Sequence, residues 1–471
     1  MGAQHAMSHA DAAWLEMDRP TNLMIITSAL WFDEPLDEGR VRQVVRERLV
    51  EPFPRFRQRV AEGVTGPAWE DDPDFDLDLH IHHLALPAPG DKAALERVVA
   101  DLMAQPLERS RPMWAFYLLD GYGEGCAVVS RMHHAIADGI ALARVMLSLT
   151  DELSGDRHTP RIAPAEPAPG DGAPQGDTGA LERLAAPLRS GAAAGRAVAG
   201  AGVHATVETV LHPGSVAELA RRGGPYGAAL LRLLSAPAEP DSALHGTLGA
   251  ARRAAWSRAL PLEAIRHSGH LRGATINDMV VAGVTGAVRS YLLAHDGEAH
   301  DIAAMVPFNL RPLDEPLPRD LGNRFGLVLL ELPATIEDAG ARLDEVATRM
   351  LALKRSRQGA VSYGILDALG RMPAAVEARI VDVMAAKAAM VLTNVPGPRA
   401  PIAFAGVPVA GVLVWAPCSG SVGMSISIFS YDGTVTAGFM TDAQLVPRPA
   451  ELVAGFEAAL AELGVAADQD S

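Results

Sequence analysis

The chain has 471 residues, of which 49% are hydrophobic and 21% charged, a composition that is ordinary for a folded globular protein and excludes global disorder. Its 41 lysines and arginines against 57 aspartates and glutamates give a formal net charge of −16, which argues against nucleic-acid binding because that requires a basic surface. Only two cysteines occur, Cys126 and Cys418, so a disulfide framework or a cysteine metal site is excluded and a reducing compartment is indicated.

The first half, residues 1–155, is predicted to mix α and β structure. A strand-like hydrophobic run occupies residues 23–32, and residues 36–49 have helical spacing with charges on one side. Residues 126–132 (CAVVSRM) form a buried-strand pattern, and residues 140–153 return to helical spacing.

A break follows this first half. Five prolines fall between residues 160 and 174, so residues 156–178 are predicted to be a linker. Residues 179–245 are rich in Ala, Gly and Arg with patchy helical periodicity, and we expect them to form connecting helices.

The α and β mixture resumes in residues 246–471. Helices are predicted at 277–293, 339–357 and 449–463, and strands at 303–306, 389–394 and 409–415. Residues 425–431 and 434–439 flank Asp432-Gly433, a pair typical of the type I′ turn of a hairpin. The resulting fold class is α+β, with two similar halves, 1–155 and 246–471, around the linker.

No targeting segment is expected from the sequence. The first residues lack the apolar core of a signal peptide, and Ala6 stands where a myristoylation motif has Ser or Thr. The uncharged stretch 400–431 is long enough to span a bilayer. Pro, Gly and Ser interrupt it, however, and its pieces alternate like strands, so we expect no membrane span.

The strongest chemical signal is the segment HHAIADG at residues 133–139. Histidine suits proton transfer near neutral pH, and here His133 and His134 follow a predicted strand and precede a helix. We expect Asp138 to stiffen this turn, most simply by pairing with a buried arginine, and Gly139 to permit the turn into the helix.

Two other interpretations apply to this segment. The histidines could be structural, as we expect for His82-His83, which no Asp-Gly follows. A zinc site is disfavoured because adjacent histidines point to different sides and no third ligand is nearby.

HHAIADG resembles the HHxxxDG motif of CoA-dependent acyltransferases with the chloramphenicol acetyltransferase fold, a superfamily that includes the condensation domains of peptide synthetases. Other segments resemble, in the same order, the bacterial wax ester synthase/diacylglycerol acyltransferase family. They are DAAWLEMDRPTN (11–22), PRFRQRV (54–60), RPMWAFYLLDG (111–121), TINDMVVA (275–282), VPFNLRP (306–312), LGNRFG (321–326) and TNVPGP (393–398). Two departures, PMW for the family's PLW and TNVPGP for SNVPGP, leave polarity unchanged.

The resemblance implies two chloramphenicol-acetyltransferase-like domains, each a mixed sheet with helices, and a tunnel between them. It also implies an O-acyltransferase that moves a fatty acyl group from acyl-CoA to diacylglycerol, a long-chain alcohol, or both. The products would be triacylglycerol or wax ester, with acyl-CoA as a substrate and neither cofactor nor metal required.

Roles for individual residues follow from this resemblance. His134 would take the hydroxyl proton in a ternary complex, while His133 serves as a second catalytic candidate or shapes the backbone. Asn277 is a candidate for oxyanion or histidine support, with an N-cap as the alternative, and Arg57 is the expected partner of Asp138.

Substrate-binding candidates are more varied. Asn394, in the TNVPGP loop, could line the tunnel or form a plain tight turn. Trp114 is a substrate-binding candidate for which packing in the core is the better interpretation. The basic cluster Lys354, Arg355 and Arg357 could hold the CoA phosphates or be a solvated helix end.

Two hypotheses are alternatives to the lipid O-acyltransferase: a condensation-type enzyme that uses carrier-bound thioesters, and a non-catalytic lipid-droplet scaffold. Because the substrates are nearly insoluble, we expect a cytoplasmic protein that associates peripherally with membranes or lipid droplets. Residues 179–234 are the candidate docking segment, with six arginines against three glutamates.

Overall fold

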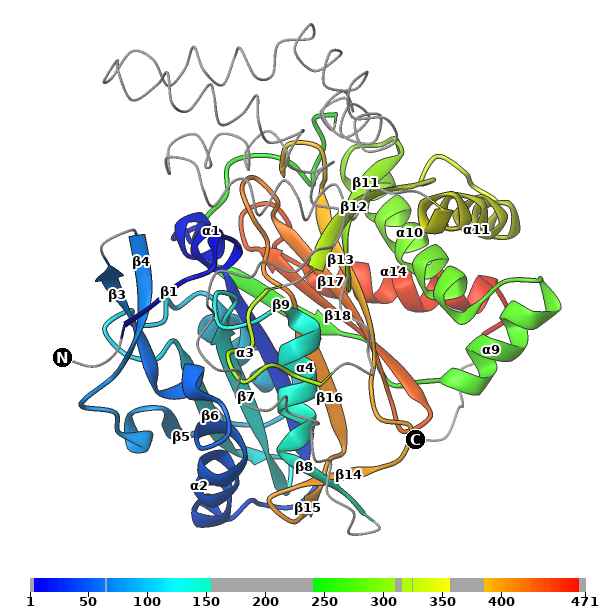
Figure 1. The fold of residues 1–471 in the computed structure, drawn as a ribbon. Helices are drawn as coiled ribbons and strands as arrows, with labels where there is room; N and C mark the ends of the chain where they lie inside the picture. Colours follow the sequence, from blue (N-terminus) through cyan, green and yellow to red (C-terminus); the bar gives the residue numbers. More distant parts are fainter. Residues whose placement is uncertain are drawn as a thin grey trace, which may run out of the picture.

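The computed structural model describes residues 4–63, 66–153, 240–309, 316–323, 325–355 and 385–465 (Figure 1). Two mixed sheets with helices lie side by side, as the α+β prediction requires. The expected linker at 156–178, nearly all of the connecting segment 179–245, and Arg357 fall outside the described residues.

The first large sheet has five strands in the order β16-β2-β7-β6-β5. β5 and β6 are parallel and the other pairs are antiparallel. All nine residues of β7, which lies between β2 and β6, are buried, so both faces of this strand are covered. The strands of the sheet are β2 (Ile25–Phe32), β5 (Ile81–Ala85), β6 (Trp114–Tyr122), β7 (Gly125–His133) and β16 (Gly411–Trp415). The helices of this half are α1 (His9–Met17), α2 (Glu38–Val45), α3 (Lys92–Met103) and α4 (Gly139–Ser148).

The second large sheet has seven strands in the order β10-β18-β17-β13-β11-β12, with β9 also paired to β18. Two of its helices, α10 and α14, pack together against it (Figure 1). Its strands are β9 (Arg252–Trp256), β10 (Leu260–Pro261), β11 (Ile302–Asn309), β12 (Phe325–Leu332), β13 (Met390–Pro396), β17 (Met424–Tyr431) and β18 (Thr434–Asp442), and its helices are α9 (Leu262–Leu271), α10 (Ile276–His295), α11 (Ala339–Arg355) and α14 (Pro449–Glu462).

Smaller elements complete the described residues. Two three-stranded sheets have the orders β1-β4-β3 and β15-β14-β8. Their strands are β1 (Gln4–Ala6), β3 (Gln58–Gly63), β4 (Gly66–Asp71), β8 (Thr150–Glu152), β14 (Ile402–Phe404) and β15 (Val407–Pro408), and the short helices are η1 (Arg46–Val50), η2 (Pro54–Arg57) and η3 (Leu77–Leu79).

Strands from late in the sequence complete sheets of the first half. β16 pairs with β2, and β14 pairs with β8. The single helix predicted at 140–153 is therefore wrong at its C-terminal end, because α4 stops at Ser148 and Thr150–Glu152 forms β8 instead. The reason is tertiary, since β8 exists through its pairing with β14.

The hairpin prediction is confirmed. Asp432 and Gly433 both have positive φ angles, 42° and 71°, as a type I′ turn requires. The uncharged stretch 400–431 contains β14, β15, β16 and β17. Among the described residues, no helix combines the length and apolar character needed to cross a membrane.

Candidate active site

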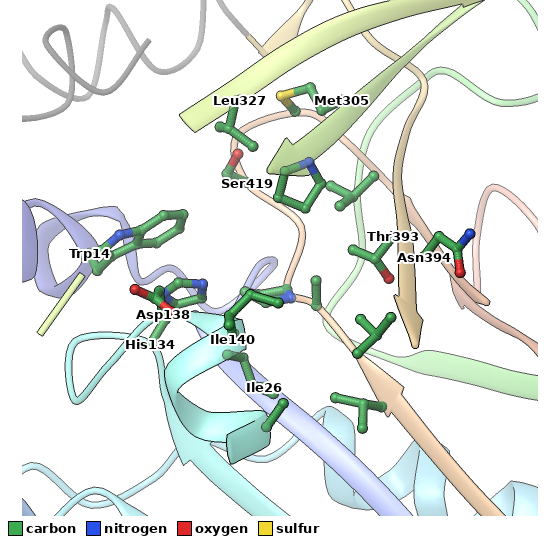
Figure 2. Close-up of a pocket in the computed structure, with 18 residues that line it drawn as sticks. Trp14, Ile26, His134, Asp138, Ile140, Met305, Leu327, Thr393, Asn394 and Ser419 are labelled. Carbon is green, nitrogen blue, oxygen red and sulfur yellow. The ribbon is translucent and has the colours of Figure 1, made fainter. Parts of the chain in front are cut away.

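A cavity of about 330 Å³ lies where the two halves meet (Figure 2). Most of the side chains around it are apolar, and they come from both large sheets and from α1 and α4. The lining residues are Trp14, Ile26, His134, Asp138, Gly139, Ile140, Ala143, Met305, Pro307, Leu327, Val391, Thr393, Asn394, Val395, Val414, Ala416, Pro417 and Ser419. An apolar cavity with few polar groups suits a ligand that has a long hydrocarbon part and one reactive end.

The HHAIADG segment forms the turn between β7 and α4 at this cavity. Asp138 is the N-cap of α4, and its Oδ1 accepts a hydrogen bond of 2.8 Å from the amide of Ala141. A second chain segment fixes the same turn, because the amide of Gly322 donates to the carbonyl of Ile136 at 3.3 Å.

The expected role of Gly139 is corrected by the structure. This residue does not have the positive φ angle that favours glycine, and a Cβ built on it meets no atom within 4 Å. The turn into α4 therefore does not require glycine. Since Gly139 lines the cavity, the missing side chain leaves space there instead.

His134 is held on several sides. Its side chain is buried, and its ring stacks on the indole of Trp14 (Figure 2). Its backbone amide donates to the carbonyl of Met24 at 2.7 Å, which ties the motif to the start of β2. Its Nδ1 lies 2.9 Å from Oδ1 of Asn323, a residue of the 316–323 segment.

Asn323 has further partners in the same cluster. Its Nδ2 donates to Oδ1 of Asp11 at 2.7 Å and to the backbone carbonyl of His134 at 2.8 Å. The backbone amide of Asn323 also donates to Asp11 Oδ1, at 3.1 Å. Asp11, Asn323 and His134 thus form one buried hydrogen-bonded chain.

Burial determines the charge state of His134. Desolvation lowers the pKa of this imidazole to about 4, against opposing contributions from the charge of Asp138 and from hydrogen bonds with its own backbone and Asn323. At neutral pH the ring is therefore neutral and able to accept a proton.

The neighbouring His133 has a different environment. Its side chain is buried, and its Nδ1 accepts a hydrogen bond of 3.1 Å from the amide of Ala135. Its Nε2 faces Oδ2 of Asp18 at 3.8 Å, and the ring is not among the cavity-lining groups. These contacts favour the alternative in which His133 shapes the backbone, and its direct part in catalysis stays a prediction.

The expected ion pair between Arg57 and Asp138 is wrong. Nη1 of Arg57 donates instead to the carbonyl of Val50, at 3.0 Å. The other two arginines of PRFRQRV also have different partners: Arg55 donates to the carbonyl of Asp320 and to Gln58, and Arg59 faces Glu70. PRFR forms a short helix that leads into β3, and these guanidinium groups contact η1, β3, β4 and the loop at Asp320.

Asn277 does not act as the predicted N-cap, because Thr275 caps α10 in a capping box with Asp278. Its Oδ1 accepts a hydrogen bond of 2.7 Å from Nδ2 of Asn394, which lines the cavity, whereas Asn277 itself does not. Asn277 thus connects to the cavity through Asn394, and its support of an oxyanion or of His134 stays a prediction.

The other predicted binding residues lie away from the cavity. Trp114 stacks on His80 and donates from Nε1 to the carbonyl of Phe56, so it is a core residue and its substrate-binding role is contradicted. Lys354 and Arg355 are exposed in the last turn of α11. No cluster of three or more metal-binding side chains occurs among the residues that the structure describes.

The contacts of His82 and His83 agree with the structural role expected for this pair. His83 is exposed and bonded to Glu38 and Asp120, and His82 stacks on Tyr117.

Three residues that contact the site were not singled out from the sequence: Asp11, Trp14 and Asn323. All three lie inside segments that carry the family resemblance, DAAWLEMDRPTN and LGNRFG. Each segment contains a polar residue among hydrophobic ones, which is the feature that could have drawn attention to it. Nothing in the local sequence, however, indicates that the two segments meet at His134.

Comparison with known proteins places these features in a family. Residues 7–280 match the model of the wax ester synthase/diacylglycerol acyltransferase catalytic domain, and residues 321–464 match that of the WS/DGAT C-terminal domain. A probable diacylglycerol O-acyltransferase of Mycobacterium tuberculosis is 28% identical over 466 residues, which cover 96% of this chain and 94% of the relative. A putative diacylglycerol O-acyltransferase of the same species is 29% identical over 438 residues, covering 90% and 87%.

Solved structures show the same fold. The wax ester synthase/diacylglycerol acyltransferase of Marinobacter aquaeolei VT8 superposes with a TM-score of 0.66 at 22% identity, covering 97% of this chain and 98% of that one. The first condensation domain of the calcium-dependent antibiotic synthetase gives a TM-score of 0.56 at 18% identity, covering 99% and 98%.

Proposed function

This chain belongs to the wax ester synthase/diacylglycerol acyltransferase family, and we propose that it transfers a fatty acyl group from acyl-CoA to the hydroxyl of a diacylglycerol or a long-chain alcohol in the cavity around His134. The family's acyl-CoA-dependent O-acyltransferase activity sets the reaction class. Membership of this family favours a lipid O-acyltransferase over the condensation-type enzyme that the sequence left open.

The observation that carries the mechanism is a buried, neutral imidazole in the wall of an apolar cavity lined by both halves. A hydroxyl is a weak nucleophile at neutral pH, so its proton must be removed as it attacks. His134 accepts that proton, and the alcohol oxygen bonds to the thioester carbon. Collapse of the tetrahedral intermediate breaks the C–S bond, and the CoA thiolate takes the proton back from the imidazolium.

This route balances without a covalent enzyme intermediate. The ester bond forms, the thioester bond breaks, and the proton moves from the hydroxyl to the thiol through His134. Both substrates must be bound together, which agrees with a cavity whose lining comes from the two halves. Cys126 is not needed as a nucleophile, since burial raises the pKa of its thiol to about 11.

An acyltransferase assay tests the proposal. Purified protein is given palmitoyl-CoA with either dipalmitoylglycerol or hexadecanol, and both free CoA and the lipid ester are measured. His134→Ala should lower the rate by about 10²–10⁴-fold, the usual loss when a general base is removed. His83→Ala, which changes an exposed histidine, is the matched control and should retain activity. A folded His134→Ala protein that keeps more than about a tenth of the wild-type rate would refute the mechanism.

The proposal includes a site for the CoA phosphates. We assign the CoA phosphates to the exposed cations at the end of α11, supported by their positive charge in an acidic chain. Reversal of Lys354 and Arg355 to Glu should raise the acyl-CoA KM more than it lowers kcat, while Arg266→Glu on α9 should leave KM unchanged. An unchanged KM in the double variant would refute this assignment.

We further assign peripheral docking at a membrane or lipid droplet, on the cytoplasmic side, to residues 179–234. The support is chemical: the substrates are nearly insoluble, and this stretch has six arginines against three glutamates in a chain of net charge −16. Glu at Arg221, Arg222 and Arg232 should weaken flotation with anionic vesicles and spare turnover of a short, soluble alcohol. Unchanged flotation would refute the docking role.

A further inference from the structure

We propose that Asn323, supported by Asp11, is a positioning residue that keeps the proton of His134 on Nδ1 and so presents the Nε2 lone pair to the substrate hydroxyl. The inference rests on the function proposed above and deepens it by identifying which nitrogen is the base and what fixes it.

The orientation of the Asn323 amide follows from its partners. One end lies 2.8 Å from the backbone carbonyl of His134, a group that can only accept a hydrogen bond, so this end is the NH₂ group. The other end, 2.9 Å from Nδ1 of His134, is then the amide oxygen, which can only accept. Nδ1 must therefore be the donor and carries the proton.

Asp11 stabilises this orientation from the other side. Its Oδ1 accepts from both the side-chain and the backbone amide of Asn323, at 2.7 and 3.1 Å. Asp11 and Asn323 are both buried, so turning the amide over would leave polar groups without partners in an apolar setting. Arg55 donates to the carbonyl of Asp320 and so restrains the same segment.

Helix α1 contributes to the arrangement through two residues on one face. Asp11 reaches Asn323, and Trp14, three positions later, stacks on the His134 ring. The ring is thus fixed both in its plane, by the hydrogen bond to Nδ1, and against rotation, by the indole.

His133 shows that the surroundings, and not the residue type, set the tautomer. Its Nδ1 accepts a hydrogen bond from the amide of Ala135, so in its neutral form the proton lies on Nε2. Two adjacent histidines are thereby held in opposite tautomers, and only His134 has its Nδ1 against an acceptor side chain.

The first experiment removes the acceptor. In Asn323→Leu, we expect kcat to fall by about 10²-fold with KM changed only a few-fold, because wrong-tautomer histidines lose most of their catalytic effect. Nitrogen NMR of ¹⁵N-histidine-labelled full-length protein reports the tautomer directly, and the His134 signal is assigned by its absence from His134→Gln. In the wild type it should show a protonated Nδ1, and in Asn323→Leu a mixture.

Asn22→Leu is the matched control for the loss of a buried amide. Asn22 is also buried and donates to the carbonyls of Gly420 and Val422, but it does not contact the His134 ring. This variant should lose stability and keep the wild-type tautomer.

A second variant covers the case in which Asn323→Leu does not fold. In Asp11→Asn/Asn323→Asp the amide and the carboxylate exchange places, so an acceptor for Nδ1 remains while a negative charge moves next to the ring. The other charged or titratable groups nearby are Asp138 and His133 on the same turn, Asp18 beyond His133, and Arg55 near Asp11. These are unchanged by the exchange. We expect activity to persist and the acid limb of the pH–rate profile to move to higher pH.

The outcomes separate this inference from the proposed function. If His134→Ala is active, the function's mechanism fails. If His134→Ala is inactive but Asn323→Leu keeps the wild-type rate and tautomer, only the role of Asn323 fails. A wild-type signal with the proton on Nε2, or an acid limb that does not move in the exchange variant, would also overturn it.

Discussion

The indole of Trp14 lies nearly parallel to the imidazole of His134, with ring centroids 4.1 Å apart and planes inclined by 18°. Trp14 is buried and lines the cavity, so its ring covers one side of the proposed base.

We expect Trp14→Ala to lower kcat by at least 10-fold, on the order of the loss from a misplaced catalytic group, and to destabilise the fold by about 3–5 kcal/mol. Trp14→Phe keeps a flat ring and should retain most activity. Trp31→Ala, whose ring stacks on Trp256 instead, is the control: it should lose stability without a matching loss in kcat. Thermal unfolding and turnover of a soluble alcohol measure the two effects, and full activity in Trp14→Ala would contradict the prediction.

Asp138 should act mainly as a helix cap. Asp138→Ala removes the acceptor for the Ala141 amide and should cost about 1 kcal/mol, whereas Asp138→Asn keeps an acceptor and should cost less. Asp37 caps α2 through the same kind of bond, to the amide of Arg40 at 2.8 Å. Asp37→Ala should therefore lower stability while leaving activity intact. Equal unfolding free energies for Asp138→Ala and the wild type would rule out the cap.

The pH dependence should reflect the buried imidazole. Because burial lowers the pKa of His134 to about 4, activity should persist on the acid side well below the ordinary histidine pKa of about 6.5 and fall only as pH approaches 4. A kcat/KM profile in overlapping buffers measures this limb. An acid limb near 6.5 would contradict the lowered pKa of His134.

The lowered pKa of His134 should also make the stability of the fold depend on pH. Between about pH 6.5 and 4 the unfolded chain binds a proton at His134 that the folded chain does not, so this residue makes stability fall as pH decreases. His134→Gln should remove that contribution, and its unfolding free energy should therefore depend less on pH in this window. If the unfolding free energies of the two proteins change equally with pH in this window, the prediction is wrong.

A buried ion pair joins two strands of the second sheet, β9 and β18, and its arginine also contacts the first half. Nη1 of Arg252 lies 2.7 Å from Oδ2 of Asp442, and the same guanidinium also donates to Asn22 and to the carbonyl of Thr21. Arg252→Ala should cost about 3–5 kcal/mol, because it leaves a buried carboxylate uncompensated.

The half-exposed pair of Arg349 and Asp301, at 2.9 Å, is the control for this ion pair. Arg349→Ala should cost no more than about 1 kcal/mol. Denaturant unfolding at neutral pH measures both, and similar losses from the two variants would show that burial is not what matters.

Asn277 and Asn394 should behave as one unit. If Asn277 acts only by holding the Asn394 amide, the losses in kcat/KM from Asn277→Ala and Asn394→Ala will not add, and the coupling should be about 0.5–3 kcal/mol. A double-mutant cycle with soluble substrates measures it. Additive losses would restore an independent role for Asn277.

Local pattern was enough to predict most elements and the reactive turn. Alternating and helical spacing located β2, β7, α10 and α14 to within a few residues, because these periods follow from backbone geometry. Asp432-Gly433 predicted its hairpin since both residues tolerate positive φ. The end of α4 could not be predicted, because β8 forms only by pairing with a strand about 250 residues later.

The sequence by itself determined the family, the fold class and which histidine is the candidate base, since the motifs that carry them are short and ordered along the chain. Only the tertiary structure decided how that histidine is held. Asn323 is 189 positions from His134 and 312 from Asp11, and a hydrogen bond between such residues depends on how the two halves pack. Arg57 was misassigned for the same reason: which buried polar groups meet is set by three-dimensional packing, and residue type and spacing do not encode it.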